Sequence, residues 1–222
     1  MYRLKTVYII IILPIVLNAC IAYYPQVVDI PLIKEKGDLR IDAGVFSAPN
    51  LRGAGDGGAH GTISYGLTNS LAIQSYACMD GASRVHLQGA LGLFKGFENK
   101  TVIEMYGGYG YGSCYWSSLF TARDNYQLVF SQFNIGKTDL GAAHIDYGLG
   151  LKGGYLFVKY EPEKDPQTIH QENGYIIEPS IFFRFGGRIV KFCTKVNYLW
   201  TKTVSDEYYL PLCISMGVNI SL

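Results

Sequence analysis

Residues 144–158, HIDYGLGLKGGYLFV, alternate between two kinds of side chain. From Ile145 to Phe157 every second residue is apolar or aromatic, with one glycine among them, and the residues between, up to Gly154, are polar or glycine. Successive side chains of a β-strand point to opposite faces, so this pattern predicts a strand with one apolar and one polar face. Residues 210–222, LPLCISMGVNISL, repeat the pattern with apolar residues at every second position.

The same period of two runs through most of the chain beyond residue 37, and no convincing helix of ten or more residues appears there. It predicts ten strands, at 38–48, 57–67, 71–79, 84–94, 101–113, 125–135, 142–159, 174–186, 188–201 and 208–222. Short connections mostly alternate with longer ones, the connection at 80–83 being the exception. This alternation is typical of transmembrane barrels, whose short turns are periplasmic. The sequence therefore predicts an all-β, up-and-down antiparallel β-barrel.

The period does not itself say which face is inside. A soluble barrel buries its apolar face, whereas a membrane barrel turns that face to lipid. Here the polar face is rich in glycine, and aromatic residues cluster near the strand ends, as they do at membrane interfaces. Charged side chains fall on the polar face, which predicts a lumenal charge network: Arg40, Asp42, Glu104, Asp146, Lys152, Glu178, Arg184, Lys191 and Lys195. We expect this network to plug the lumen with paired side chains. A soluble periplasmic lipoprotein barrel that binds an apolar ligand is the alternative.

The N-terminus has the layout of an export signal. Arg3 and Lys5 precede an apolar run at 7–17, which is too short for a spanning helix of about 20 residues. Leu17-Asn18-Ala19-Cys20 then resembles the lipobox of bacterial lipoproteins, which implies that Cys20 becomes an acylated (for example palmitoylated) N-terminal residue. The predicted domains are a signal peptide at 1–19, a lipidated extended tether at 20–37 and a β-barrel at 38–222. An even strand number brings both termini to the short-turn side, so we expect a periplasmic N-terminus.

Composition excludes some partners. The chain has 19 basic and 18 acidic residues, so charge gives no reason to expect a nucleic-acid partner. Charged residues make up 17% of the chain, against roughly 25% in ordinary soluble domains. Outer-membrane lipid is the expected partner. Four cysteines besides Cys20 could form disulfides in an oxidising compartment, with their pairing open: Cys78, Cys114, Cys193 and Cys213.

No catalytic, cofactor or metal site is predicted. Gly148, Gly150 and Gly153 match the dinucleotide fingerprint as letters, but that fingerprint needs a helix where this chain continues as a strand. The four histidines, His60, His86, His144 and His170, lack ligand spacing. A narrow pore, or an outer-membrane protease using His60 and Asp56 at the extracellular mouth, are minor alternatives.

The leader, loops and strands together resemble small outer-membrane β-barrel proteins of Gram-negative bacteria, in particular uncharacterised lipoprotein barrels of the Bacteroidetes. The stretches that carry the resemblance are SYGLTNSLAI at 64–73, EMYGGYGYG at 104–112 and EPSIFFRFG at 178–186. The resemblance implies an outer-membrane barrel with a structural, adhesive or surface-interaction role and no catalysis.

Overall fold

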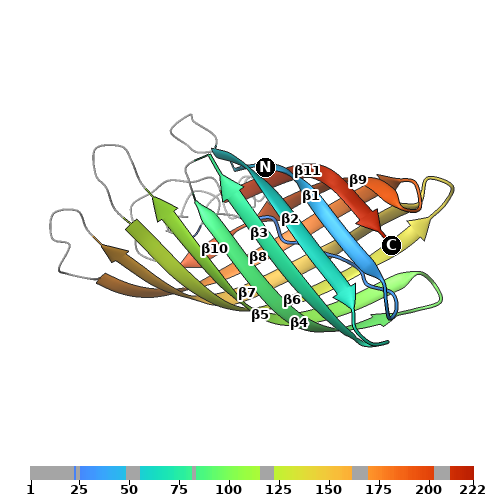
Figure 1. Cartoon of the computed structure of the whole chain (residues 1–222), viewed down its shortest axis with the longest axis horizontal. Helices are drawn as coiled ribbons and strands as arrows, with labels where there is room; N and C mark the ends of the chain where they lie inside the picture. Colours follow the sequence, from blue (N-terminus) through green and yellow to red (C-terminus); the bar gives the residue numbers. More distant parts are fainter. Residues whose placement is uncertain are drawn as a thin grey trace, which may run out of the picture.

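The computed structural model describes residues 23, 26–48, 56–81, 84–115, 123–161, 170–202 and 211–222. They form a single antiparallel sheet of strongly tilted strands that closes on itself (Figure 1). The strands are β1 (Leu39–Ala48), β2 (Asp56–Gly66), β3 (Leu71–Asp80), β4 (Val85–Gly96), β5 (Thr101–Tyr115), β6 (Arg123–Leu140), β7 (Ile145–Glu161), β8 (His170–Gly186), β9 (Val190–Tyr198), β10 (Trp200–Lys202) and β11 (Leu212–Ser221).

Neighbours along the chain are neighbours in the sheet from β1 to β8. Both β9 and β10 pair with β8 and are separated only by Leu199, so together they make one barrel strand. The barrel thus has ten strands, and the predicted all-β up-and-down class is confirmed. Its seam is the antiparallel pair of β1 and β11, which runs from Arg40 opposite Ser221 to Ser47 opposite Ile214.

Most strand boundaries lie within a few residues of the predicted ones. The largest difference is β6, expected at 125–135, which continues to Leu140. Its pairing with β7 shifts register between Lys137 and Leu140, and this irregularity disrupts the alternation on which the prediction depended. At the other rim β5 to β8 extend beyond the shorter strands β1 to β4.

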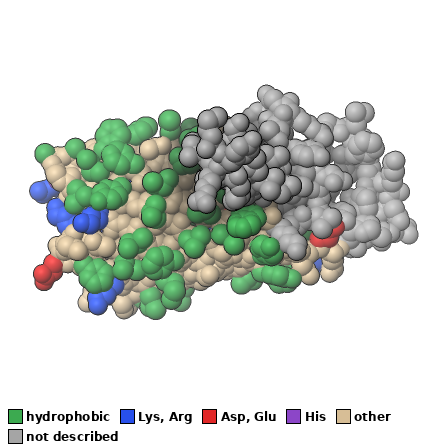
Figure 2. Space-filling model, turned by 180° about the vertical axis from the view of Figure 1, so that it is seen from behind, with side chains coloured by type: hydrophobic (Ala, Val, Ile, Leu, Met, Phe, Trp, Pro, Cys, Tyr) green, Lys and Arg blue, Asp and Glu red, His purple; other side chains and the backbone are tan. Residues whose placement is uncertain are grey.

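The apolar face points outward. Leu149 and Ile181 are more than half exposed, whereas their inward neighbours Lys152 and Ser180 are buried. Figure 2 shows hydrophobic side chains along the outer face of the barrel, with Lys and Arg side chains gathered at one end. A water-soluble barrel with an apolar interior would have the opposite pattern, so that alternative is wrong. Among the described residues, no helix is long and apolar enough to cross a membrane.

Residues 26–33, which we call the plug segment, run through the interior of the barrel, where all eight are buried. Figure 1 shows this part of the chain in blue, inside the strands and leading into β1. The segment comes from the long-loop half of the barrel and reaches the short-turn rim, where residues 34–38 reverse the chain. Gly37, at φ 87°, donates its N–H to the carbonyl oxygen of Gly66 in this reversal.

The direction of the plug segment corrects the expected topology. We expected the chain to come to β1 from the short-turn side, because β1 begins there. Instead, the described chain reaches β1 from within the lumen and begins nearer the opposite rim. The tether prediction for 20–37 gave this segment no place in the barrel, and residues 1–22, with the signal peptide and Cys20, lie outside the described part of the chain.

Candidate functional site: the filled lumen

Apolar side chains of the plug segment meet different levels of the barrel wall. Val27 shares a buried cluster with Phe46, Ala48, Tyr76, Cys78 and Cys213, most of which lie near the long-loop ends of their strands. Ile30 and Leu32 cluster with Val102 and Phe182. Ile33 clusters with Ala72, Phe94 and Tyr106 near the short-turn rim. The segment is therefore in contact with the wall along most of its length.

Glycines in the wall make room for the plug segment. A Cβ atom built on Gly150 would lie 2.7 Å from Cδ1 of Ile30 and 2.6 Å from Oγ of Ser180, and one built on Gly136 would lie 2.7 Å from Cδ1 of Leu32. Any side chain at these two positions would occupy the space that the plug segment fills. The glycine-rich polar face is thus explained in part by the chain that passes beside it.

Gly150→Ala should lower the free energy of unfolding by about 1–3 kcal/mol, the usual cost of overpacking a filled interior. The measurement is urea unfolding of the purified protein in lipid vesicles. Gly153→Ala on the same strand is the matched control, because its nearest heavy atom to an added Cβ is 3.9 Å away. Equal stability of the two variants would contradict tight packing of Ile30 against β7.

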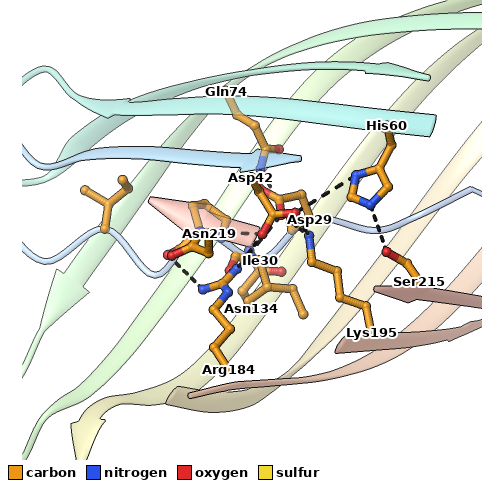
Figure 3. Close-up of polar contacts among 12 residues, drawn as sticks. Asp29, Ile30, Asp42, His60, Gln74, Asn134, Arg184, Lys195, Ser215 and Asn219 are labelled. Atoms are coloured by element: carbon orange, nitrogen blue, oxygen red, sulfur yellow. Dashed lines mark hydrogen bonds and ion pairs between the residues drawn. The ribbon is translucent and has the colours of Figure 1, made fainter. Parts of the chain in front are cut away.

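A four-residue charge cluster fixes the middle of the plug segment (Figure 3). Lys195 Nζ lies 2.5 Å from Oδ1 of Asp29 on the plug and 2.7 Å from Oδ1 of Asp42 on β1. Arg184 Nη2 lies 3.9 Å from Asp29 and 3.7 Å from Asp42, and it donates to the carbonyl oxygen of Ile30 at 2.6 Å. Two acids thus face two bases, and one of the acids belongs to the plug.

The structure places all nine predicted lumenal charges inside the barrel, each at most 3% exposed. Each of the five bases has a carboxylate within 4 Å. Beyond the four-residue cluster, Lys152 Nζ lies 3.5 Å from Glu178, Lys191 Nζ lies 2.6 Å from Asp146, and Arg40 Nε lies 3.1 Å from Asp38. Buried charges are costly unless they are paired, and these pairs meet that requirement.

The contacts of Glu104 differ from the ion pair with a base that we expected. Its carboxylate accepts the backbone N–H of Ile33 at 2.7 Å and the side-chain amide of Asn134 at 2.9 Å. Tyr106 donates its hydroxyl to the same carboxylate at 3.3 Å. This carboxylate therefore holds the plug backbone in place through hydrogen bonds.

A second polar group holds the start of the described chain. Tyr23 donates its hydroxyl to Glu178 at 3.0 Å, and Gln26 donates its side-chain amide to the hydroxyl of Tyr126 at 2.8 Å. The carbonyl oxygen of Gln26 accepts the amide of Asn197 at 3.0 Å. Tyr126 also contacts Nδ1 of His86 at 2.9 Å.

His60, Ser215 and Asp42 are the residue types of a hydrolytic triad, but they are not arranged as one. His60 Nε2 lies 2.8 Å from Ser215 Oγ, whereas Nδ1 lies 4.0 Å from Asp42, whose carboxylate is bound by Lys195 and Arg184. All three triad-type residues are at most 5% exposed, so no substrate reaches them in this arrangement. The protease alternative requires His60 at the extracellular mouth with Asp56, whereas His60 is buried inside the barrel.

The remaining histidines and cysteines form no joint site among the described residues. His144 is at the short-turn rim, 2.6 Å from Asp139, and the side chain of His170 lies outside the described part. Cys78, Cys193 and Cys213 are buried free thiols, and the side chain of Cys114 is not described. Within the described ranges no group of three His, Cys, Asp or Glu residues is placed to hold a metal ion.

Sequence reasoning missed Tyr23, Gln26, Asp29 and Ile33 as lumenal residues. One signal could have found them. A flexible tether is usually rich in glycine and serine, whereas QVVDIPLI at 26–33 has neither and carries a single acid among apolar residues. A short apolar stretch with one charge needs both an apolar enclosure and a buried base, and the barrel interior supplies both.

A closed barrel with an apolar outer belt, aromatic residues toward both rims and a charged, filled lumen defines the class of the protein. It is a small membrane-spanning β-barrel of the outer-membrane type. No protein-family model and no curated protein sequence matches the chain.

Three solved structures are similar in fold at low identity. They are Ail, the attachment invasion locus protein of Yersinia pestis (11% identity, TM-score 0.40, 84% of this chain and 99% of that one), Neisserial surface protein A (10%, 0.40, 83% and 96%) and the outer membrane protein OprG of Pseudomonas aeruginosa (12%, 0.26, 85% and 97%). The class assignment depends on the burial pattern of this chain, and the link to Bacteroidetes lipoprotein barrels stays a prediction.

Proposed function

We propose that this protein is a lipid-anchored outer-membrane barrel whose lumen is closed by its own plug segment. Its role is structural or adhesive, carried out by the long loops at the cell surface, and it performs no catalysis. The observation that carries the proposal is the inverted burial: lipid-compatible side chains outside, paired charges inside, and a chain segment filling the space between the charges.

Two features support a closed lumen without activity. Lys195 and Arg184 each lie within 4 Å of both Asp29 and Asp42, so one charge cluster holds the plug to the wall. The side chains of His60, Ser215 and Asp42 are each at most 5% exposed inside the barrel. A conducting pore would require the plug segment to leave the lumen. The proposed orientation, with the long loops at the cell surface, is the usual one for outer-membrane barrels.

Leu149→Arg tests the membrane placement of the outer face. Leu149 is 56% exposed on the mid-barrel surface, where an arginine facing lipid costs about 2–4 kcal/mol. We expect this loss in urea unfolding from lipid vesicles, together with outer-membrane fractionation and a heat-modifiable gel mobility of the wild type. Leu67→Arg, at an exposed position beside the short β2–β3 turn, is the control and should cost about 0–1 kcal/mol.

If Leu149→Arg is as stable as Leu67→Arg, and the wild type fractionates with soluble periplasmic proteins, the outer face meets water and the proposed function is wrong.

A further inference from the structure

The outer face of the barrel changes from apolar to polar near the long-loop ends of β7 and β8. On β7 the outward side chains are apolar or aromatic from Tyr147 to Phe157, with Gly153 among them, and the next outward residue is Lys159. On β8 they are apolar or aromatic from Phe185 to Tyr175, and the next outward residue is Asn173. Both strands therefore extend beyond the apolar belt on the long-loop side.

The height of this apolar belt matches that of a membrane core. Each of the two runs covers ten steps along its strand, which is about 34 Å at about 3.4 Å per step, or about 24 Å in height for a tilt of about 45°. Outer-membrane barrels carry an apolar band about 25 Å tall. Lys159 and Asn173 therefore lie just outside the hydrocarbon, at the level of the lipid headgroups.

A cavity of about 210 Å³ lies at this boundary, over β5 to β8. Its outward-facing lining residues belong to two cross-strand rows, with Tyr111, Gln127, Phe157 and Asn173 in one and Asn125, Lys159 and Gln171 in the next. The buried side chains of Tyr126 and Val158 complete the lining. Most of the lining side chains are exposed, so the cavity opens to the outside of the wall and not into the lumen.

The lining has the chemistry of a sugar-binding site. Four of its side chains are amides, and an amide both donates and accepts hydrogen bonds, as a sugar hydroxyl does. Tyr111 donates its hydroxyl to Oδ1 of Asn125 at 3.0 Å, which holds this amide beside the ring. The rings of Tyr111 and Phe157 are each 43% exposed, and an aromatic ring presents an electron-rich face to the C–H groups of a sugar.

Other ligands match the lining less well. A phosphate group on its own is usually held by several Arg or Lys side chains, whereas Lys159 is the only charged residue among the nine described residues that line this cavity. An apolar ligand would cover four amides without giving them partners, which costs free energy. The cavity is also smaller than the roughly 300 Å³ at which sites for drug-sized ligands begin, so its size favours a single ring.

We propose that this cavity binds one sugar ring of a membrane glycolipid that carries an acidic group. Lys159 faces the acidic group, and Tyr111 and Phe157 contact the ring. A glycolipid fits better than a soluble glycan, because the next cross-strand row toward the belt is apolar or aromatic, exposed and able to contact acyl chains: Tyr109, Val129, Tyr155 and Tyr175. The inference rests on the proposed function for the membrane placement and for the outward long loops, which make the occupant a glycolipid of the outer leaflet.

The test measures lipid binding by the purified full-length protein in phosphatidylcholine nanodiscs. Three probes are added separately in equal amounts: rough-type lipopolysaccharide, which has acidic sugars, phosphatidylglycerol, which is acidic without a sugar ring, and a neutral glycosyl diacylglycerol. Native mass spectrometry counts the lipids that stay bound to the barrel. We expect the wild type to retain lipopolysaccharide in preference to both other probes.

Variants of the lining locate the binding. Lys159→Gln should weaken lipopolysaccharide binding about tenfold, as the loss of a hydrogen bond to a charged group does, and should leave binding of the neutral glycolipid unchanged. The double variant Gln127→Ala and Asn173→Ala should weaken the binding of both glycolipids. Lys95→Gln is the matched control, because it removes an exposed cation at the short-turn rim and should change nothing.

Each contrary result has one meaning. Equal lipopolysaccharide binding by the wild type, Lys159→Gln and the double variant would overturn the inference. Equal retention of phosphatidylglycerol would show an acidic phospholipid as the occupant, and equally tight binding of the delipidated core oligosaccharide would show a soluble glycan; either result overturns it too. A wild type that enters no nanodisc and lacks heat-modifiable mobility would refute the proposed function itself, whereas an inserted, folded barrel that retains no glycolipid refutes only the inference.

Discussion

Asp29→Ala should lower the free energy of unfolding by about 3–5 kcal/mol where the site is dry, and by less where water enters. The reason is local charge. Asp29 and Asp42 together neutralise Lys195 and Arg184, so removing Asp29 leaves two buried cations facing one carboxylate. Urea unfolding in lipid vesicles measures the loss.

Two further variants show whether charge pairing is the cause. Glu35→Ala removes an acid from the exposed reversal just beyond the plug segment and should change stability little. Adding Lys195→Met to Asp29→Ala restores one acid facing one base, and should recover part of the loss. A double variant no more stable than Asp29→Ala alone would contradict the pairing as the source of the effect.

Replacing the plug segment with a glycine–serine linker of equal length should convert the closed barrel into a conducting one. The linker keeps the reach from Tyr23 to Lys34 but loses the apolar contacts of Val27, Ile30 and Leu32 and the ion pairs of Asp29. Without these contacts, nothing offsets the loss of conformational entropy on ordering the linker inside the lumen, so the linker should not fill it. Planar bilayer recordings should then show single-channel steps, while the wild type shows little or no steady current.

The recordings are interpreted only for a linker variant that shows heat-modifiable mobility. A folded linker variant that conducts no better than the wild type would mean that wall side chains alone close the lumen. A large stable current from the wild type would instead show that the plug segment does not seal it, and would favour the pore alternative.

The barrel could be predicted from sequence because lipid on one side and a polar interior on the other impose a period of two on every strand. Leu149 and Lys152 show this contrast on one strand. The plug could not be predicted in the same way. Barrel wall surrounds residues 26–33 on all sides, so Val27 and Val28 are both buried and no alternation arises.

The partners of the lumenal charged side chains could not be predicted from the sequence either, for a geometric reason. Phase along a strand places Glu104 inside, but its partners come from the plug, from β6 and from its own strand. The two-residue period predicted Asp42 as a lumenal residue. Its role, however, depends on Asp29, which lies in the plug segment, where that period is absent. Contacts across a barrel depend on the registers of all strands at once, which no single strand pattern contains.

The seam between β1 and β11 has a consequence for biogenesis. The plug segment continues directly into β1, and pairing of β1 with β11 joins the first strand of the wall to the last. Residues 26–33 are buried inside the closed wall, in contact with side chains of several strands. We therefore expect that the plug segment is in place before β1 pairs with β11 and closes the wall. In that order of assembly, we expect Asp29 to supply the counter-charge for Arg184 on β8 and Lys195 on β9 as these strands join the barrel.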